Sequence, residues 1–112
     1  MNILMIINKK INLIGEIMKG YWSMRVNVED ETSYKQYAER AKLAIEKFGG
    51  KYHVRGGKFE IVEGKHDFAR NVIVEFQSFE IAKKCFNSKE YQEARSFRVD
   101  KADFNGIIIE GY

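Results

Sequence analysis

The residues best suited to chemistry lie in the stretch HVRGGKFEIVEG, residues 53 to 64. Arg55 presents a planar fork of N–H donors that suits a carboxylate or a phosphate. His53 stands two positions earlier, so on a regular strand both side chains point to the same side, and a histidine ring can act as acid or base near neutral pH. This pattern predicts a site for a small anionic or polar organic molecule, with Arg55 as its anchor and His53 as a candidate catalytic residue.

Glu75 is the other candidate for proton transfer. It lies in NVIVEF, on the side of that stretch opposite to the apolar residues. A carboxylate there can serve as a general base or as the partner of a cation. Arg55 has the same ambiguity, because an ion pair to Glu60 or Glu75 would occupy its guanidinium. Two interpretations therefore stay open, a ligand site and a structural ion pair.

Other kinds of site have little support in the composition. The two histidines, His53 and His66, form no metal-binding spacing, and Cys85 has no second cysteine, so no metal is expected. The glycines of RGGKFE lead into more strand and not into a helix, so no nucleotide cofactor is expected either. A formal net charge of +3 without a basic stripe argues against nucleic acid. The lone cysteine fits a reducing compartment, so we expect a cytoplasmic protein.

The first nineteen residues, MNILMIINKKINLIGEIMK, have apolar residues that are nearly all Ile, Leu and Met. Their positive charges follow the apolar run, unlike those of a secretory signal, and the run is shorter than the ~20 residues that span a bilayer. A surface helix against a membrane or a partner is one interpretation. We prefer another, because Gly15-Glu16 is encoded by a purine-rich string that can resemble a ribosome-binding site before Met18. On this interpretation Met18 is the natural start, so within the N-terminal extension 1–19 the first 17 residues are not part of the natural protein, and 20–112 form a single domain without membrane contact.

Alternation and capping residues predict the elements of the first half. From Gly20, apolar residues at every second position (Trp22 to Val28) predict a half-buried strand. Asp30 then offers a helix N-cap, and an apolar stripe follows at helical spacing. Tyr34 and Tyr37 belong to this stripe, and a phenol from it could project into a cleft. Gly49-Gly50 supplies the helix stop.

The second half repeats this order. Strands are expected over 52–63 and 71–76, and Ser78 and Ser88 each precede a helical stretch that they can cap. FNGIIIEG predicts the last strand. The order β-α-β-β-α-β is that of the ferredoxin-like α+β fold, an antiparallel sheet with helices on one face. The bare face would expose Tyr21, Ile73 and either Phe104 or Ile107, so we expect a homodimer through that face.

The Arg-Gly-Gly segment interrupts the strand expected over 52–63. The core-like residues are Tyr52 and Val54 before the glycines, but Phe59 and Ile61 after them, and a regular strand cannot change parity. A tight Gly-Gly hairpin would repair this, and so would a β-bulge at Gly56-Gly57 within one long strand. We favour the bulge, because the hairpin would have a very short first arm.

The motifs of the chain resemble a known family, the one of domain of unknown function 1330 in the dimeric α/β-barrel superfamily. The matching stretches are GYW at 20–22, YKQYAE at 34–39, KFGGKYHVRGGKFEIVEG at 47–64, NVIVEFQSFEIAKKCFNSKEYQEARSFR at 71–98 and IIEG at 108–111. The resemblance implies a ferredoxin-like subunit, a dimer with facing sheets that form a barrel, and a cleft between sheet and helices. It implies no established activity. Gln77 and His53 depart from the family pattern, which usually has proline and an apolar residue at these two positions.

These considerations lead to two functional hypotheses. In the first, the protein binds or converts a small organic acid in a cleft near Arg55, without metal or nucleotide. Tyr37, together with Ser78, Tyr91 and Arg98 from the family-like segments, would complete its ligand-binding set, although capping explains Ser78 and packing explains much of Tyr91. In the second, the protein is a non-enzymatic dimeric module in which Arg55 and Glu75 join strands or subunits.

Overall fold

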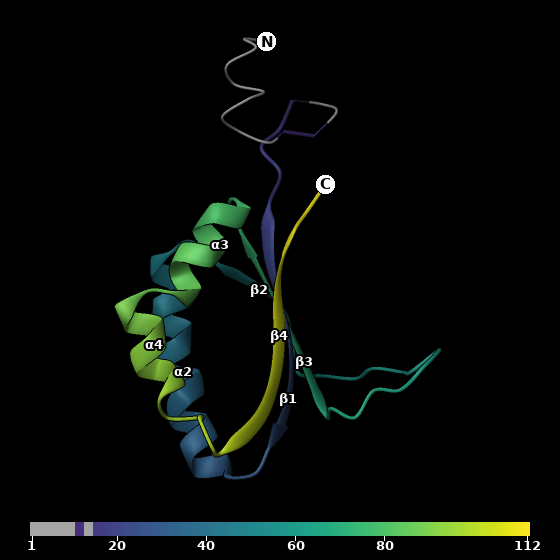
Figure 1. Ribbon diagram of the computed structural model, residues 1–112, viewed down its shortest axis with the longest axis vertical. Helices are drawn as coiled ribbons and strands as arrows, with labels where there is room; N and C mark the ends of the chain where they lie inside the picture. Colours follow the sequence, from purple (N-terminus) through teal and green to yellow (C-terminus); the bar gives the residue numbers. More distant parts are fainter. Residues whose placement is uncertain (1–10, 13–14) are drawn as a thin grey trace.

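The computed structural model describes residues 11–12 and 15–112 and has the predicted ferredoxin-like α+β arrangement. In chain order the elements are β1 (Gly20–Val28), α2 (Glu31–Lys47), β2 (Lys51–Arg55), β3 (Arg70–Phe76), α3 (Phe79–Phe86), α4 (Lys89–Arg95) and β4 (Ala102–Glu110). The strands form one antiparallel sheet in the order β2-β3-β1-β4. Figure 1 shows that the three helices all lie on one side of this sheet.

The helices begin at the positions that the capping residues predicted. The Asp30 carboxylate accepts from the Ser33 amide at 3.1 Å, and this hydrogen bond lowers the pKa of Asp30. Ser78 and Ser88 accept from Ile81 and Tyr91 in the same way, both at 3.1 Å. Each cap satisfies a backbone N–H that has no partner within its helix.

The core lies between the helices and the inner face of the sheet. Trp22 is its centre, with its ring against Phe76 and Tyr91 at centroid distances of 5.0 and 4.8 Å. The indole Nε1 donates to the Ala82 carbonyl at 2.9 Å, so the polar atom of this ring is also satisfied. Because a fully buried large apolar side chain contributes about 1.5–3 kcal/mol, this aromatic cluster is a major source of stability.

The other face of the sheet is bare and partly apolar. The register of β1 with β4 places Ile107 and Ile109 beside Ser23 and Tyr21, and both isoleucines are exposed, at 55% and 49%. Phe104 lies on the helix side, so of the two alternatives Ile107 belongs to the bare face. In the register of β1 with β4, buried Val26 lies opposite Phe104, so both side chains face the core.

The prediction of one long strand over 52–63 with a bulge at Gly56-Gly57 is wrong. β2 ends at Arg55, and its register against β3 shifts between Tyr52 and Val54, so the irregularity falls at His53. Gly56 and Gly57 have φ of 73° and 92°, a left-handed backbone that cannot continue a strand. The hairpin alternative is also wrong, since residues 57–62 form no strand.

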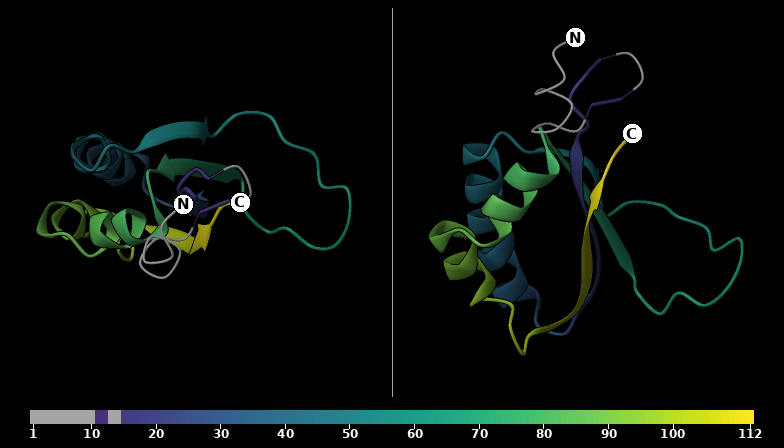
Figure 2. Two further views of the ribbon diagram at one scale, coloured as in Figure 1. Left: turned by 90° about the horizontal axis from the view of Figure 1, so that it is seen from above. Right: turned by 45° about the horizontal axis from the view of Figure 1, so that its top comes forward.

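The chain leaves the sheet at these glycines and forms a long loop over residues 56–69. Figures 1 and 2 show this loop projecting from the side of the sheet that faces away from the helices. Phe59, Ile61 and Val62 are exposed on it. Loop 56–69 therefore adds exposed apolar surface on the same side as the bare face.

The predicted N-terminal extension, residues 1–19, falls largely outside the described residues. Within the part that the structure describes, no helix is long and apolar enough to cross a membrane.

Candidate functional site

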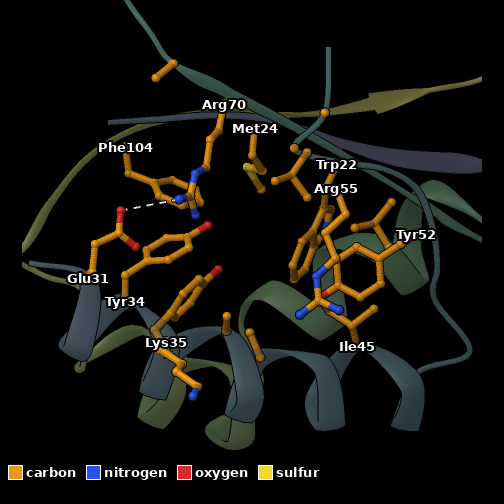
Figure 3. Close-up of a pocket in the computed structure, with 18 of the residues that line it drawn as sticks. Trp22, Met24, Glu31, Tyr34, Lys35, Ile45, Tyr52, Arg55, Arg70 and Phe104 are labelled. Atoms are coloured by element: carbon orange, nitrogen blue, oxygen red, sulfur yellow. Dashed lines mark hydrogen bonds and ion pairs between the residues drawn. The ribbon is translucent and has the colours of Figure 1, made fainter. Parts of the chain in front are cut away.

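A pocket of about 980 Å³ lies between α2 and the inner face of the sheet (Figure 3). We call it the large pocket. Its volume is near the upper end of the range of roughly 300–1,000 Å³ that is common for small-molecule sites. The sheet contributes Trp22, Met24, Val72, Val74 and Phe104, α2 contributes its inner residues from Glu31 to Ile45, and the entrance includes Arg55, Gly56, Gly57 and Arg70.

Arg55 stands at the entrance of the large pocket, at the end of β2. Because the bulge at His53 corrects the alternation, Arg55 pairs with Val72 and its side chain turns to the helix side. The guanidinium lies 4.5 Å from the centre of the Tyr52 ring, and Figure 3 shows it reaching toward α2. Among the described residues it has neither an ion pair nor a hydrogen bond, so the expected pairing with Glu60 or Glu75 is absent. Its donors are available to a ligand.

Arg70 is a second arginine of the large pocket. Its Nη2 lies 3.3 Å from the Glu31 carboxylate, and its guanidinium stands 5.2 Å from the Tyr34 ring centre. Lys35 also lines the pocket. The lining thus includes three cationic residues and one carboxylate, Glu31, which pairs with Arg70, and this balance favours an anion, although Figure 3 shows the Lys35 side chain pointing away from the pocket.

The tyrosines of the large pocket are hydrogen-bond donors at neutral pH. Burial raises the pKa of Tyr52 to about 12 and the pKa of Tyr37 well above its ordinary value. Burial also raises the pKa of Tyr34, although the charge of Arg70 opposes this. Since all three phenols stay protonated, none of them provides a base near pH 7.

Tyr37 connects the large pocket to a buried arginine. Its hydroxyl lies 2.8 Å from that of Tyr91, which accepts from Arg98 Nη2 at 3.2 Å. Burial opposes the charge of Arg98, but the oxygens of Tyr91 and Tyr37 outweigh it, so the pKa of this arginine is raised. Of the predicted ligand-binding residues, Arg55 and Tyr37 line the large pocket, whereas Tyr91 and Arg98 lie behind Tyr37.

His53 and Glu75 lie on the opposite face of the sheet. His53 Nε2 and the Tyr21 hydroxyl each lie 3.4 Å from Glu75 Oε1. The prediction that His53 points to the same side as Arg55 is wrong, because the bulge at His53 places the two side chains on different faces. The two candidate proton-transfer residues thus meet each other, but they do not line the large pocket.

Ser78 and Cys85 have structural roles and do not line the large pocket. Ser78 caps α3 and lies outside the lining of the large pocket. Cys85 is buried, its thiol donates to the Ala44 carbonyl at 3.8 Å, and burial raises its pKa to about 12, so it is a poor nucleophile. No three metal-binding side chains of the kinds His, Cys, Asp and Glu gather within residues 11–12 and 15–112.

A family model for a domain of unknown function (DUF1330) matches residues 19–112. The chain belongs to this family. The glycine of the GYW stretch in this DUF1330 chain has a physical explanation, because a Cβ at Gly20 would lie 2.4 Å from the Ser78 carbonyl oxygen. The strand start and the start of α3 can approach so closely only without a side chain at this position.

Solved structures share the fold of this DUF1330 protein. A protein of unknown function from Rhodopseudomonas palustris has 21% identity and a TM-score of 0.67, over 85% of this chain and 83% of that chain. A dimeric ferredoxin-like protein of unknown function from Jannaschia sp. CCS1 has 13% identity and a TM-score of 0.56, over 81% and 97%. SnoaB, a cofactor-independent oxygenase from Streptomyces nogalater, has 5% identity and a TM-score of 0.53, over 82% and 91%. At these identities the likeness shows the fold alone, and no curated protein matches the sequence.

Sequence reasoning missed Arg70 and Lys35 as pocket residues. Lys35 lies next to Tyr34 on the first turns of α2, where a position near the pocket could have been inferred from the helical stripe. Arg70 begins β3 after loop 56–69, and its side of the sheet depends on the register with β1. Without the register, its place beside Glu31 had no signal in the sequence.

Proposed function

We propose that the large pocket binds a small organic acid whose carboxylate is held by Arg55. The observation that carries this proposal is the guanidinium of Arg55, which has an aromatic ring beneath it and no acidic partner among the described residues. An arginine in this state offers two parallel N–H donors, the geometry that a carboxylate accepts. Stacking on Tyr52 restricts the guanidinium and thereby reduces the entropy lost when a ligand binds.

The walls of the large pocket suit an acid with a flat apolar body. Tyr52, Tyr34, Trp22 and Phe104 contribute aromatic surface, and Met24 contributes an adaptable thioether. Arg70 and Lys35 would add to the attraction for a negative charge. A second polar group on the ligand could accept a hydrogen bond from a protonated phenol.

The arrangement supports binding more strongly than conversion. The phenols that line the large pocket stay protonated at neutral pH, and the His53–Glu75 pair is on the far face. The carboxylate in the lining, Glu31, is paired with Arg70, so a reaction in this pocket would have to use this ion-paired carboxylate or a proton acceptor of the ligand itself. We propose a binding protein, located in the cytoplasm, in accord with a single buried cysteine.

The bare face supports a second component of the proposal, a homodimer with facing sheets. Exposed Ile107 and Ile109 lie on the same face as Tyr21 and Ile73 and form an apolar strip with them, which Ser23 interrupts between Ile107 and Ile73. Exposed strips of this kind mark partner surfaces, and a second copy of the chain is the simplest partner. The Jannaschia sp. CCS1 protein of similar fold is dimeric, which supports self-association, and facing sheets would close the two subunits into a barrel.

A thermal-shift screen tests the binding proposal. The probes are benzoate, phenylacetate, salicylate and succinate, each with its neutral amide as control. A ligand at about 100 times its Kd stabilises the folded state by about 2.7 kcal/mol, so an acid that binds raises the Tm by several degrees. We expect Arg55→Ala to abolish this rise, and we expect Arg40→Ala, which removes an exposed arginine stacked on Phe97, to leave it unchanged.

The same variants separate the alternative, a dimeric module without a ligand. In that case Arg55→Ala would lower the Tm or weaken the dimer measured by light scattering, and no acid would shift the Tm of either protein. A rise that is equal in wild type and Arg55→Ala would remove Arg55 from the site.

A further inference from the structure

A buried cation without an acidic partner lies at the end of the helical layer. Arg98 is only 5% exposed, and its Nε, itself buried, has no hydrogen-bond partner. Its contacts are the Tyr91 hydroxyl at 3.2 Å and the ring faces of Phe104 and Tyr37, at 3.6 and 5.1 Å from their centres. Within the described part of the chain no carboxylate pairs with it. Aromatic faces and the Tyr91 hydroxyl stabilise the charge, but they leave the buried Nε–H without an acceptor.

The backbone of Arg98 is firmly held, so this placement is built into the fold. Its amide donates to the Arg95 carbonyl at 3.0 Å, and its carbonyl accepts from Lys101 and Ala102 at 2.9 and 3.1 Å. The following turn contains Asp100 with φ of 66°, the left-handed residue that returns the chain to β4. These backbone hydrogen bonds fix the point from which the Arg98 side chain starts, and its contacts with Tyr91, Phe104 and Tyr37 hold the guanidinium inward.

Arg98 lines a second pocket, of about 290 Å³, beside the edge strand β4. We call it the small pocket. Arg95 is its other cation, and its remaining lining is apolar or without a side chain: Met24, Phe86, Phe104, Gly106, Ile107 and Ile108. Two guanidinium groups against apolar walls match a molecule with one anionic end and an apolar body.

The small pocket is distinct from the large pocket. The two share Met24 and Phe104 as a dividing wall, but Arg55 lines only the large one and Arg98 only the small one. A ligand carboxylate at Arg98 would therefore not depend on Arg55.

We propose that the small pocket is a second binding site, which takes a small monocarboxylate with an apolar body through Arg98, with Arg95 as the second cation. The ligand carboxylate is the acidic partner that Arg98 does not have among the described residues. The apolar body of the ligand lies between Phe86 and Ile108. This proposal is independent of the ligand of the large pocket.

The experiment uses hexanoate as the probe and hexan-1-ol as its neutral counterpart, in a chloride-free buffer. Titration of the folded protein is followed by calorimetry and by the Nε–Hε NMR signal of Arg98. We expect hexanoate to shift this signal saturably and hexan-1-ol to leave it in place. Contacts from the hexanoate methyl group to Phe86 or Ile108 would locate the ligand.

Variants complete the test. Arg98→Met should weaken hexanoate binding by about tenfold or more, because a charge-assisted double hydrogen bond is lost. Arg98→Lys keeps the charge but loses the fork, and it should be intermediate. Arg40→Met, which changes an arginine outside both pockets, should bind as wild type does, and in Arg55→Ala the Arg98 signal should shift saturably as it does in wild type.

The stability of Arg98→Met distinguishes a ligand site from a structural role. Arg98→Met loses the hydrogen bond to the Tyr91 hydroxyl and the contacts with two rings, so its Tm should fall modestly in acid-free buffer, and hexanoate should raise the Tm of wild type but not that of Arg98→Met. A lowered Tm with unchanged binding would overturn the proposal, as would the absence of a saturable shift in wild type. Loss of the Arg98 signal shift in Arg55→Ala would make the shift depend on the large pocket and would also overturn the proposal. If Arg98→Met does not fold, the proposal is decided by the hexanoate-dependent shift of the Arg98 signal in wild type and by the affinity of Arg98→Lys for hexanoate.

Discussion

The two faces of the sheet are built from alternate residues of the same strands, but they differ in what covers them. On the helix side, Trp22, Val26, Val74 and Phe76 are almost fully buried. On the bare side, Tyr21 and Ile73 lie at the corresponding positions with exposed Ile107 and Ile109 beside them. The inner face thus holds the fold together and contains both pockets, while the outer face is available to a partner. Substitutions that are matched across the sheet test this division.

The largest effect is expected for Trp22→Ala. It removes the ring at the centre of the aromatic cluster and leaves a cavity, so it should lower the free energy of unfolding by about 3–5 kcal/mol. Urea denaturation measures this loss. Tyr21→Ala, at the adjacent position on the bare face, is the control and should cost less than half as much. Equal losses would contradict the contrast between the two faces.

Ile107→Glu tests the partner surface. A charge on the apolar strip should weaken the proposed dimer by about 2–4 kcal/mol, since both copies would bury an unpaired carboxylate. Analytical ultracentrifugation measures the dissociation constant. Leu43→Glu changes an equally aliphatic and exposed residue on the outer side of α2, and it should leave the dimer intact. If Leu43→Glu dissociates the dimer and Ile107→Glu does not, the interface lies on the helices.

Ser78→Ala tests the contribution of the α3 N-cap to the stability of the helical layer. Loss of the side-chain oxygen that accepts from Ile81 should cost about 1 kcal/mol of unfolding free energy, since one amide of α3 loses its partner. Ser23→Ala, on the bare face, should stay within about 0.5 kcal/mol of wild type. Thermal denaturation by circular dichroism compares them, and a ligand-binding defect in Ser78→Ala with unchanged stability would assign Ser78 to a site.

Tyr52→Phe is expected to have the smallest effect at neutral pH, within about 0.5 kcal/mol. Folding raises the Tyr52 pKa from 10.0 to about 12, so the protonated phenol is the form that the fold prefers. The stability it contributes is present below pH 10 and is lost as the pH rises toward 12. The decline of Tm with pH over this range should therefore be shallower in Tyr52→Phe than in wild type. A Tyr112→Phe control, at the exposed C-terminal residue, should decline as wild type does.

The local features of the sequence predicted most of the elements correctly. Asp30, Ser78 and Ser88 begin helices at the expected positions, because a cap acts on amides within three residues. The failure at Gly56-Gly57 has an equally local origin. Alternation treated Phe59 and Ile61 as core residues, whereas the left-handed glycines release the chain into loop 56–69, where both side chains are exposed.

The candidate sites could be predicted only in part. Tyr37 lines the large pocket as the apolar stripe of its helix indicated, whereas Arg55 lines it only because the bulge in β2 turns its side chain to the helix side. His53 and Arg55 were expected on one side of the strand, but the bulge in β2 reverses the alternation after His53 and turns Arg55 to the opposite face. Arg70 was not found, and Arg98 was expected near Arg55 but lines a separate pocket.

The sequence by itself determined the order of elements, the helix boundaries and the division of the strands into a core face and an outer face. These depend on period, capping and side-chain chemistry within a few residues. Only the tertiary structure decided where β2 ends, which charges meet and that two arginines serve two cavities. These outcomes depend on strand register and on contacts between residues far apart in the chain, such as Arg70 with Glu31 and Arg98 with Phe104. A single extra residue in a strand changes the register, and the local pattern of residues does not predict where such a bulge occurs.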